Sequence, residues 1–314
     1  MFIIDVHDCG KIMNREWRPL FLGITFLALC GIAAAADKPS VDAAYQESFD
    51  KWKSELIEDL KQEWLPLAGL FWLKPGENSF GTDPKNAIVF PKGPAQAGSF
   101  TLQGNTVTGN FIPGTAATIG GKPVTSSELE SDTDGHPTVV EIGSLRLHVI
   151  VRGQRVGIRV KDVDSDAVRQ YRGPLFFPLD LSYRVTATWL PSDGKQTVDV
   201  PNVLGDVTPT PIAGTAVFKI NGQELRLSDL GGDAAKELFF VFSDPTSKTN
   251  TYPGGRFLKA GPVENGAVVL DFNRAYNPPC SVTPYATCPL APKENRLAVP
   301  IAAGEEYDHK TGHH

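Results

Sequence analysis

Residues 144–160 of this 314-residue chain read SLRLHVIVRGQRVGIRV, and they indicate the fold class. Apolar and polar residues alternate from Leu145 onward, which is typical of a strand with one buried face. A turn follows at residues 152–153, and the apolar residues resume over 154–160. The stretch therefore predicts two antiparallel strands joined by a tight turn.

The same pattern of short apolar runs separated by Gly, Pro, Asn and Asp continues along most of the chain. The strongest hairpin signal is Asn221-Gly222, because both residues tolerate the positive φ of a type I′ turn. Further strands are predicted within residues 98–112, 138–142, 183–190, 196–203, 215–220, 223–227, 238–242 and 267–272. Strands at this density, without helices between them, predict a mainly β protein with an antiparallel sandwich or barrel-like domain.

One strong amphipathic helix is predicted, over residues 41–63. Its apolar residues recur at spacings of three and four, which places them on one face. That face consists of Tyr45, Phe49, Trp52, Leu56 and Leu60. We expect the helix to pack on the β domain; binding to a partner protein is the alternative.

The N-terminus is predicted to be a cleaved signal peptide, residues 1–36. A short basic region precedes the apolar run of residues 19–36, which ends with Ala34 and Ala36 in A-x-A spacing. We therefore expect an exported protein, periplasmic or secreted, with no stable membrane insertion after cleavage.

Other interpretations of this segment remain open. The apolar run is close to the shortest spanning length of about 17 residues, so a retained membrane anchor is one alternative. A lipoprotein site at Cys30 is another, and Met13 is a second candidate start. The rest of the chain is predicted as an N-terminal helix in residues 37–65, a single β domain in 66–308 and a frayed tail in 309–314.

Charge and motifs exclude several functional classes. The net charge of −6 argues against a nucleic-acid partner, because no basic excess exists to replace counterions around phosphates. G-x-S-x-G, H-E-x-x-H, P-loop and G-x-G-x-x-G motifs are all absent, which leaves enzyme activity undecided. No cofactor is implied.

No metal site is predicted either. Asp162, Asp164 and Asp166 have the spacing that begins a calcium loop. However, Ala167 replaces the required glycine and Gly173 replaces the bidentate glutamate, so we expect a solvated acidic turn.

Cleavage of residues 1–36 would leave two cysteines, Cys280 and Cys288. In an oxidising compartment two cysteines this close most simply form a disulfide, worth about 2.5 kcal/mol for so small a loop. A redox pair and a pair of metal thiolates are the alternatives, although the spacing is wider than C-x-x-C.

The candidate site surrounds the loop of residues 271–297, DFNRAYNPPCSVTPYATCPLAPKENRL. Prolines make it neither helix nor strand, and a long rigid loop is costly to order unless something uses it. Asp271 and Asn273 are predicted to lie on one side of a strand that enters the loop, with Phe272 on the other.

Arginines and aspartates at the ends of other strands would complete a polar pocket suited to an anionic or hydroxyl-rich ligand. The alternative is that these side chains satisfy backbone groups of the loop itself. The candidate ligand-binding residues are Arg159, Asp162, Arg256, Asp271, Asn273, Tyr276, Asn277 and Asn295.

Several longer motifs suggest a family. They are GLFWL (69–73), GENSFG (76–81), GIRVKD (157–162), TYPGGRFL (251–258), DFNRAYNPPC, TPYATCP, ENRL and AGEEY (303–307). With them the chain resembles, over residues 45–307, a bacterial and archaeal family known only as domain of unknown function 1684. Ala291 departs from the pattern, where a proline is expected. The resemblance implies that the candidate residues and both cysteines match signature positions, and it implies no activity.

The sequence leads to two hypotheses. In the first, an exported protein binds, with or without chemical conversion, a small anionic or polar ligand in a pocket beside the loop of residues 271–297. Arg159 and Arg256 engage its charge, and Asp162 and Asp271 orient it or exchange protons. In the second, the protein is a non-catalytic envelope or interaction module whose polar residues only brace the loop.

Overall fold

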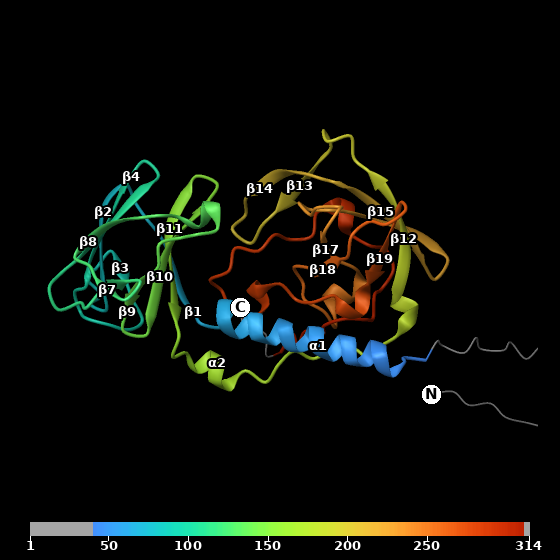
Figure 1. The fold of residues 1–314 in the computed structure, drawn as a ribbon, viewed down its shortest axis with the longest axis horizontal. Coiled ribbons are helices and arrows are strands. Elements are labelled where there is room, and N and C mark those ends of the chain that lie inside the picture. Colours follow the sequence, from blue (N-terminus) through green and yellow to red (C-terminus); the bar gives the residue numbers. More distant parts are fainter. Residues whose placement is uncertain (1–39, 311–314) are drawn as a thin grey trace, which may run out of the picture. The chain divides into compact units, whose positions relative to one another are not determined.

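The computed structural model describes residues 40–310, which belong to one compact unit. The predicted signal peptide and residues 311–314 of the predicted tail lie outside this range. The fold is mainly β, with antiparallel sheets and one long N-terminal helix, as predicted (Figure 1). Its sheets pack in a sandwich-like manner, and none closes into a barrel within residues 40–310.

Two sheets surround the first hydrophobic core. The larger contains, in spatial order, β1 (Leu67–Trp72), β11 (Arg155–Asp162), β10 (Leu145–Arg152), β9 (Val140–Ile142), β6 (Thr118–Ile119) and β7 (Lys122–Pro123). The smaller contains β3 (Ile88–Val89), β2 (Gly76–Gly81), β4 (Gly98–Gln103), β5 (Thr106–Phe111) and β8 (Ser126–Leu129). Phe80 and Phe100 stack at 4.4 Å between ring centroids, in a core shared with Leu147 and Ile158.

A second core lies in the C-terminal half. It is covered by the sheet of β16 (Gln223–Ser228), β15 (Gly214–Ile220), β12 (Arg184–Pro191) and β19 (Ala267–Asp271), and by the pair β17 (Leu238–Phe242) and β18 (Arg256–Ala260). A further pair consists of β13 (Thr197–Pro201) and β14 (Val207–Pro211). Leu227, Phe240, Leu258 and Phe272 have no exposed surface in this core.

The predicted hairpins are confirmed. β10 and β11 pair antiparallel from Leu145 opposite Asp162 to Arg152 opposite Arg155. Asn221 and Gly222 join β15 to β16 with φ of 52° and 77°, the left-handed values that their residue types allow.

At the start of β2 the amide of Asn78 binds the backbone of Lys74, and the residues from Gly76 onward pair with β4. Two short segments differ from the prediction. The strand predicted over 267–272 ends at Asp271, whose carboxylate caps the 3-10 helix Phe272–Arg274. The acidic turn contains α2 (Asp166–Gln170), capped by Ser165.

The predicted N-terminal helix is confirmed as α1 (Ala43–Asp59), followed by a π-helical turn, Leu60–Trp64. The carboxylate of Asp42 caps it by accepting from the backbone of Tyr45. Among the residues of α1 that belong to the predicted apolar face, Phe49 is buried, and Trp52 and Leu56 remain partly exposed. Within residues 40–310 no helix has the length and hydropathy to cross a membrane.

Candidate functional site

The loop of residues 271–297 contains three short 3-10 helices joined by turns and irregular segments. They are Phe272–Arg274, Pro279–Ser281 and Lys293–Asn295. Because its prolines lack backbone N–H groups, the loop depends on side chains for many of its hydrogen bonds. Side chains in and around the loop are therefore needed to hold its backbone in place.

Two of the predicted asparagines are braces, by which we mean side chains that hold other parts of the protein in place through hydrogen bonds. Asn295 has no exposed surface; its amide donates to the carbonyls of Ser228 (2.8 Å) and Val241 (3.0 Å) and accepts from the backbone of Ser228 (2.8 Å). Asn273 binds both backbone groups of Asp180 at 3.0 Å. Neither amide is free for a ligand.

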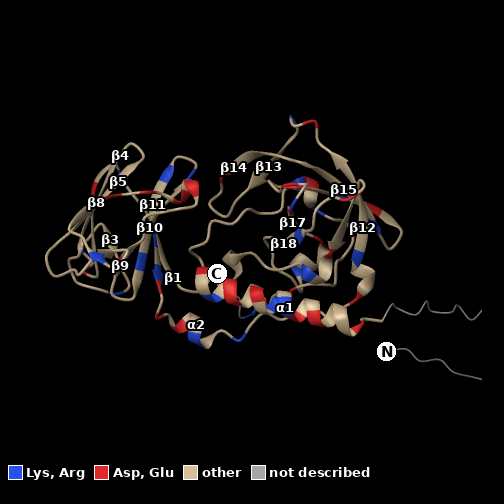
Figure 2. Cartoon of the chain, viewed as in Figure 1, with Lys and Arg blue, Asp and Glu red and all other residues tan. Residues whose placement is uncertain are grey.

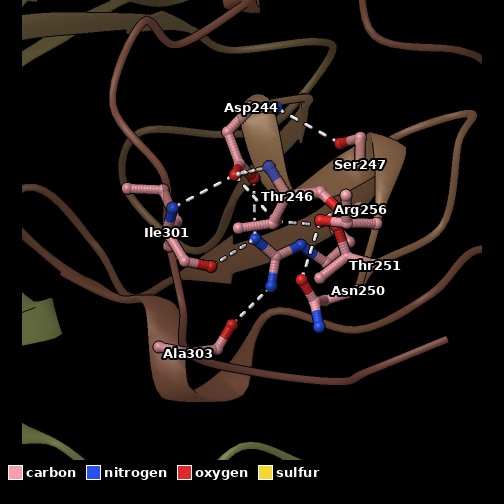
Figure 3. A network of polar contacts seen from close by, with 9 residues as sticks. Asp244, Thr246, Ser247, Asn250, Thr251, Arg256, Ile301 and Ala303 are labelled. Carbon is pink, nitrogen blue, oxygen red and sulfur yellow. Dashed lines mark hydrogen bonds and ion pairs between the residues drawn. The ribbon is translucent and has the colours of Figure 1, made fainter. Parts of the chain in front are cut away.

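Arg256 is also a brace, which corrects the expectation that it engages a ligand. Its Nη2 lies 2.8 Å from a carboxylate oxygen of Asp244 and 2.9 Å from the carbonyl of Ile301, and Nη1 donates to the carbonyl of Ala303 (Figure 3). Neither side chain of the ion pair has any exposed surface. Burial lowers the pKa of Arg256, and Asp244 opposes this shift.

Asp162 closes the end of β11. One of its oxygens lies 2.6 Å from Nζ of Lys92, and the other accepts from the backbone of Asp164 at 3.1 Å. Burial raises the pKa of Asp162, but hydrogen bonds from Lys92 and Ser144 outweigh it, so the pKa lies below its usual value. Asp162 thus stabilises a turn rather than facing a cavity.

Asp271 attaches the helix α1 to the end of β19. The hydroxyl of Tyr45 donates to both carboxylate oxygens, at 3.0 and 2.9 Å, across 226 positions of sequence. Arg274 and Arg184 lie 3.6 and 3.9 Å from the same carboxylate. Burial, and next the negative charge of Asp271, raise the pKa of Tyr45.

A groove runs along α1 beside these residues. It consists of three pockets of about 450, 480 and 230 Å³, and neighbouring pockets share lining residues. One wall is formed by Tyr45, Ser48, Trp52, Glu55, Leu56, Asp59, Leu60, Glu63 and Trp64. The other wall includes Arg184, Glu237, Phe239, Phe257, Lys259, Asp271, Arg274, Tyr276, Asn277 and Pro279. We call it the α1 groove.

The centre of the α1 groove combines aromatic rings with carboxylates. The rings of Trp52 and Tyr276 meet edge to face at 6.3 Å. Glu55 and Asp59 lie on the same side of α1, whose surface is rich in acidic residues (Figure 2). Burial, and next the charge of Glu237, raise the pKa of Tyr276, so its hydroxyl stays protonated and can donate.

Asn277 connects the groove to a buried acid. Its backbone N–H donates to Oε2 of Glu305 at 2.8 Å, and its side-chain amide donates to the carbonyl of Glu306 at 2.9 Å. Its Oδ1 is buried and has no partner in the described part of the chain. Burial raises the pKa of Glu305 to about 8, against the hydrogen bonds from Asn277.

Arg159 lies in a different sheet from Arg256 and Asp271, on the β11 face opposite the first core. Its side chain is only 6% exposed, and its guanidinium lies 5.8 Å from the ring of Trp64 at the end of the α1 groove. Burial, and next the charge of Arg152, lower its pKa. His148, opposite it on β10, has its pKa lowered to about 4 by burial and next by Arg159.

The cysteines differ from the expectation of a disulfide. Cys280 and Cys288 are both buried free thiols, and the backbone N–H of Cys280 donates to Sγ of Cys288 at 3.3 Å. The two side chains are adjacent, but the predicted bond is not formed in this structure.

The predicted residues thus divide into separate groups. Asp271, Tyr276 and Asn277 line the α1 groove; Asp162, Arg256, Asn273 and Asn295 are braces; Arg159 is isolated beneath Trp64. Sequence reasoning missed Trp52, Glu55, Asp59 and Lys259. Trp52, Glu55 and Asp59 recur at helical spacing on α1, a signal that is indistinguishable in sequence from an ordinary amphipathic helix.

The comparisons with known proteins match the C-terminal part of the chain. The family model described as "Protein of unknown function (DUF1684)" matches residues 169–306, which include the proline-rich loop. The chain belongs to this family.

Among solved structures, the chain is similar to an uncharacterized protein of Haloarcula marismortui, determined by solution NMR. The two are 30% identical over 45% of this chain and 80% of that chain, with a TM-score of 0.38. The chain matches no curated protein.

The buried ion pair predicts a strong asymmetry between single and double substitutions. Asp244→Ala should lower the free energy of unfolding by about 3–5 kcal/mol, because it leaves Arg256 buried and unpaired. Asp244→Leu combined with Arg256→Met should cost less than Asp244→Ala alone. Urea denaturation measures both, with Glu224→Ala in an exposed pair as the control, expected to change stability by about 0–1 kcal/mol. A double variant less stable than Asp244→Ala would contradict this account.

The buried acid predicts a pH dependence. The pKa of Glu305 is raised from 4.5 to about 8 in the folded protein, so the folded state binds the extra proton between these values. Its contribution to stability is therefore fully present below pH 4.5 and is lost as pH rises through about 8. The slope should reach at most about 1.4 kcal/mol per pH unit.

Urea denaturation at several pH values checks this expectation. Glu305→Gln should flatten the decline within this window, whereas the exposed Glu264→Gln serves as the matched control. A decline of unchanged slope in Glu305→Gln would assign it to other groups.

Proposed function

We propose that this protein binds a small hydroxyl-rich ligand in the α1 groove. The observation that carries the proposal is the central pocket of about 480 Å³, where Trp52 and Tyr276 lie beside Glu55 and Asp59. Flat aromatic faces stack on the apolar face of a ring, and carboxylates accept hydrogen bonds from its hydroxyl groups.

The charges of the groove distinguish the two ligand classes expected from the sequence. Lys259 is already paired with Glu237 at 2.9 Å, and Arg274 lies beside Asp271. In the described part of the chain neither Glu55 nor Asp59 pairs with Lys259 or Arg274, and Glu55 has only a loose, exposed contact with Lys51 at 4.0 Å. Ionised carboxylates only accept hydrogen bonds, so this part of the groove favours a neutral ligand with donor hydroxyls over an anion.

The proposed function is binding of the ligand. The alternative of a bracing module is supported by a separate observation, since the Nη atoms of Arg256 and the amides of Asn273 and Asn295 bind groups inside the protein. Under that alternative the α1 groove binds no small molecule, and one titration separates the two hypotheses.

Calorimetric titration with neutral sugars such as methyl glucoside and methyl N-acetylglucosaminide tests the proposal. Asp59→Asn should weaken binding about 10- to 100-fold, because it removes a charge-assisted acceptor. Tyr276→Phe should weaken it about 2- to 10-fold through the loss of one neutral hydrogen bond. Tyr285→Phe, in the same loop but outside the groove lining, is the control. Absence of binding, or binding unaffected by Asp59→Asn and Tyr276→Phe, would refute the proposal.

We also propose that the protein is exported to the periplasm or secreted, on the basis of the apolar run and A-x-A spacing in residues 19–36. In an oxidising compartment the adjacent thiols of Cys280 and Cys288 would close a disulfide. Protein recovered from the exported fraction should start near Asp37 and show no free thiols after denaturation without reductant. Two reactive thiols per chain would contradict the disulfide, and an intact N-terminus would contradict cleavage.

A further inference from the structure

The outer faces of β10 and β11 carry an unusual concentration of positive charge. On these strands, side chains that point away from the first core alternate with those that enter it. The cationic side chains on this face are Arg146, Arg152, Arg155, Arg159 and Lys161, and His148 lies among them. Lys and Arg are visible along both strands in Figure 2.

All of these cations except Arg159 have an acidic partner. The partner carboxylates lie 3.6 Å from Arg146 (Glu141), 2.7 Å from Arg152 (Asp132), 2.9 Å from Arg155 (Asp206) and 2.5 Å from Lys161 (Glu63). The Nε and Nη2 atoms of Arg159 have no hydrogen-bond partner within residues 40–310. Its neighbours on the same face include a second arginine and a histidine.

Burial makes this lack of a partner significant. Arg159 is only 6% exposed, and an unpaired charge taken out of water costs several kcal/mol. In buried Arg256, by contrast, one carboxylate and two carbonyls accept from the Nη atoms, and only Nε has no partner within residues 40–310. Within residues 40–310 no carboxylate pairs with Arg159, because the nearby Asp132 and Glu63 are paired with Arg152 and Lys161.

The geometry of the free atoms indicates which partner fits. Nε and Nη2 lie on one edge of the guanidinium plane and present two parallel N–H groups. Two oxygens of one carboxylate match this edge in a bidentate pair. Glu63 is already paired with Lys161, and Asp59 lies along the same groove, so a single negative charge fits these surroundings better than a phosphate dianion.

Trp64 connects Arg159 with the α1 groove. It is the last residue of the π-helical turn Leu60–Trp64, a type of helix that is rare and frequent at functional sites. Its indole lies over the guanidinium and also lines the end of the groove. One ring therefore contacts both the groove and the guanidinium of Arg159.

We propose that Arg159 is a carboxylate-binding subsite at the Trp64 end of the α1 groove, so that the ligand is a hydroxyl-rich acid of the sugar-acid class. This inference rests on the proposed function, because the hydroxyl-bearing part of the ligand occupies the groove. The subsite adds a cationic contact for the ligand's carboxylate, which the acidic centre of the groove does not supply.

Parallel calorimetric titrations with glucuronate, glucose, acetate and inorganic phosphate test the subsite. The intact protein should bind glucuronate at least about tenfold more tightly than glucose, as one bidentate charge-assisted contact allows. Arg159→Met should abolish this preference and leave glucose binding unchanged. Arg159→Lys, which keeps the charge but loses the planar fork, should lose most of the preference.

Two controls separate a binding role from a structural one. Arg155→Met removes a paired arginine from the same strand and should keep the preference for glucuronate. Arg159→Met should also melt at the same or a higher temperature than the unchanged protein without ligand, because it removes an unpaired buried charge. A clear fall in melting temperature would indicate that Arg159 is a brace and would overturn the inference.

The outcomes also distinguish this inference from the proposed function. Equal binding of glucose and glucuronate, or a preference that persists in Arg159→Met, would overturn the subsite while the groove stands. Failure of both sugars to bind would refute the proposed function itself and, with it, this inference. Phosphate that competes with glucuronate more strongly than acetate does would overturn the assignment to a carboxylate.

Discussion

The buried pair of Arg256 and Asp244 holds together the parts of the C-terminal half that form the candidate site. Arg256 starts β18, and its guanidinium binds the carbonyls of Ile301 and Ala303 near the end of the chain. Asp244 also accepts from the backbone of Ile301 at 3.1 Å. The segment fixed in this way carries Glu305, which in turn receives the backbone N–H of Asn277. The position of one wall of the α1 groove therefore depends on a charge pair that has no exposed surface.

The opposite wall is positioned by a different polar contact. Tyr45 near the start of α1 donates to Asp271 at the end of β19, while Phe49 packs edge to face on Phe176 at 5.4 Å. The helix is thus attached at its N-terminal end, and its central residues Trp52 and Leu56 stay only partly covered. A helix bound fully along its apolar face would leave no groove.

Sequence reasoning pointed to residues 271–297, but it could not assign the roles of their individual side chains. The density of asparagine and aspartate in residues 271–297 correctly indicated side chains with specific hydrogen bonds. The pattern could not show that Asn273 and Asn295 bind backbone groups while Asn277 keeps a buried oxygen without a partner. Nor could it show that Arg159 and Arg256 occupy opposite situations, because both are arginines in strands followed by apolar residues.

The sequence by itself determined the mainly β class, the hairpins at residues 152–153 and at Asn221-Gly222, and the N-terminal helix. These features depend on local periodicity and turn chemistry, which are properties of neighbouring residues. Only the tertiary structure decided which polar side chains have hydrogen-bond partners, because these partners are distant in sequence. Tyr45 and Asp271, for example, are 226 positions apart. Satisfaction of a buried polar group depends on what surrounds it in space, and local sequence carries no such information.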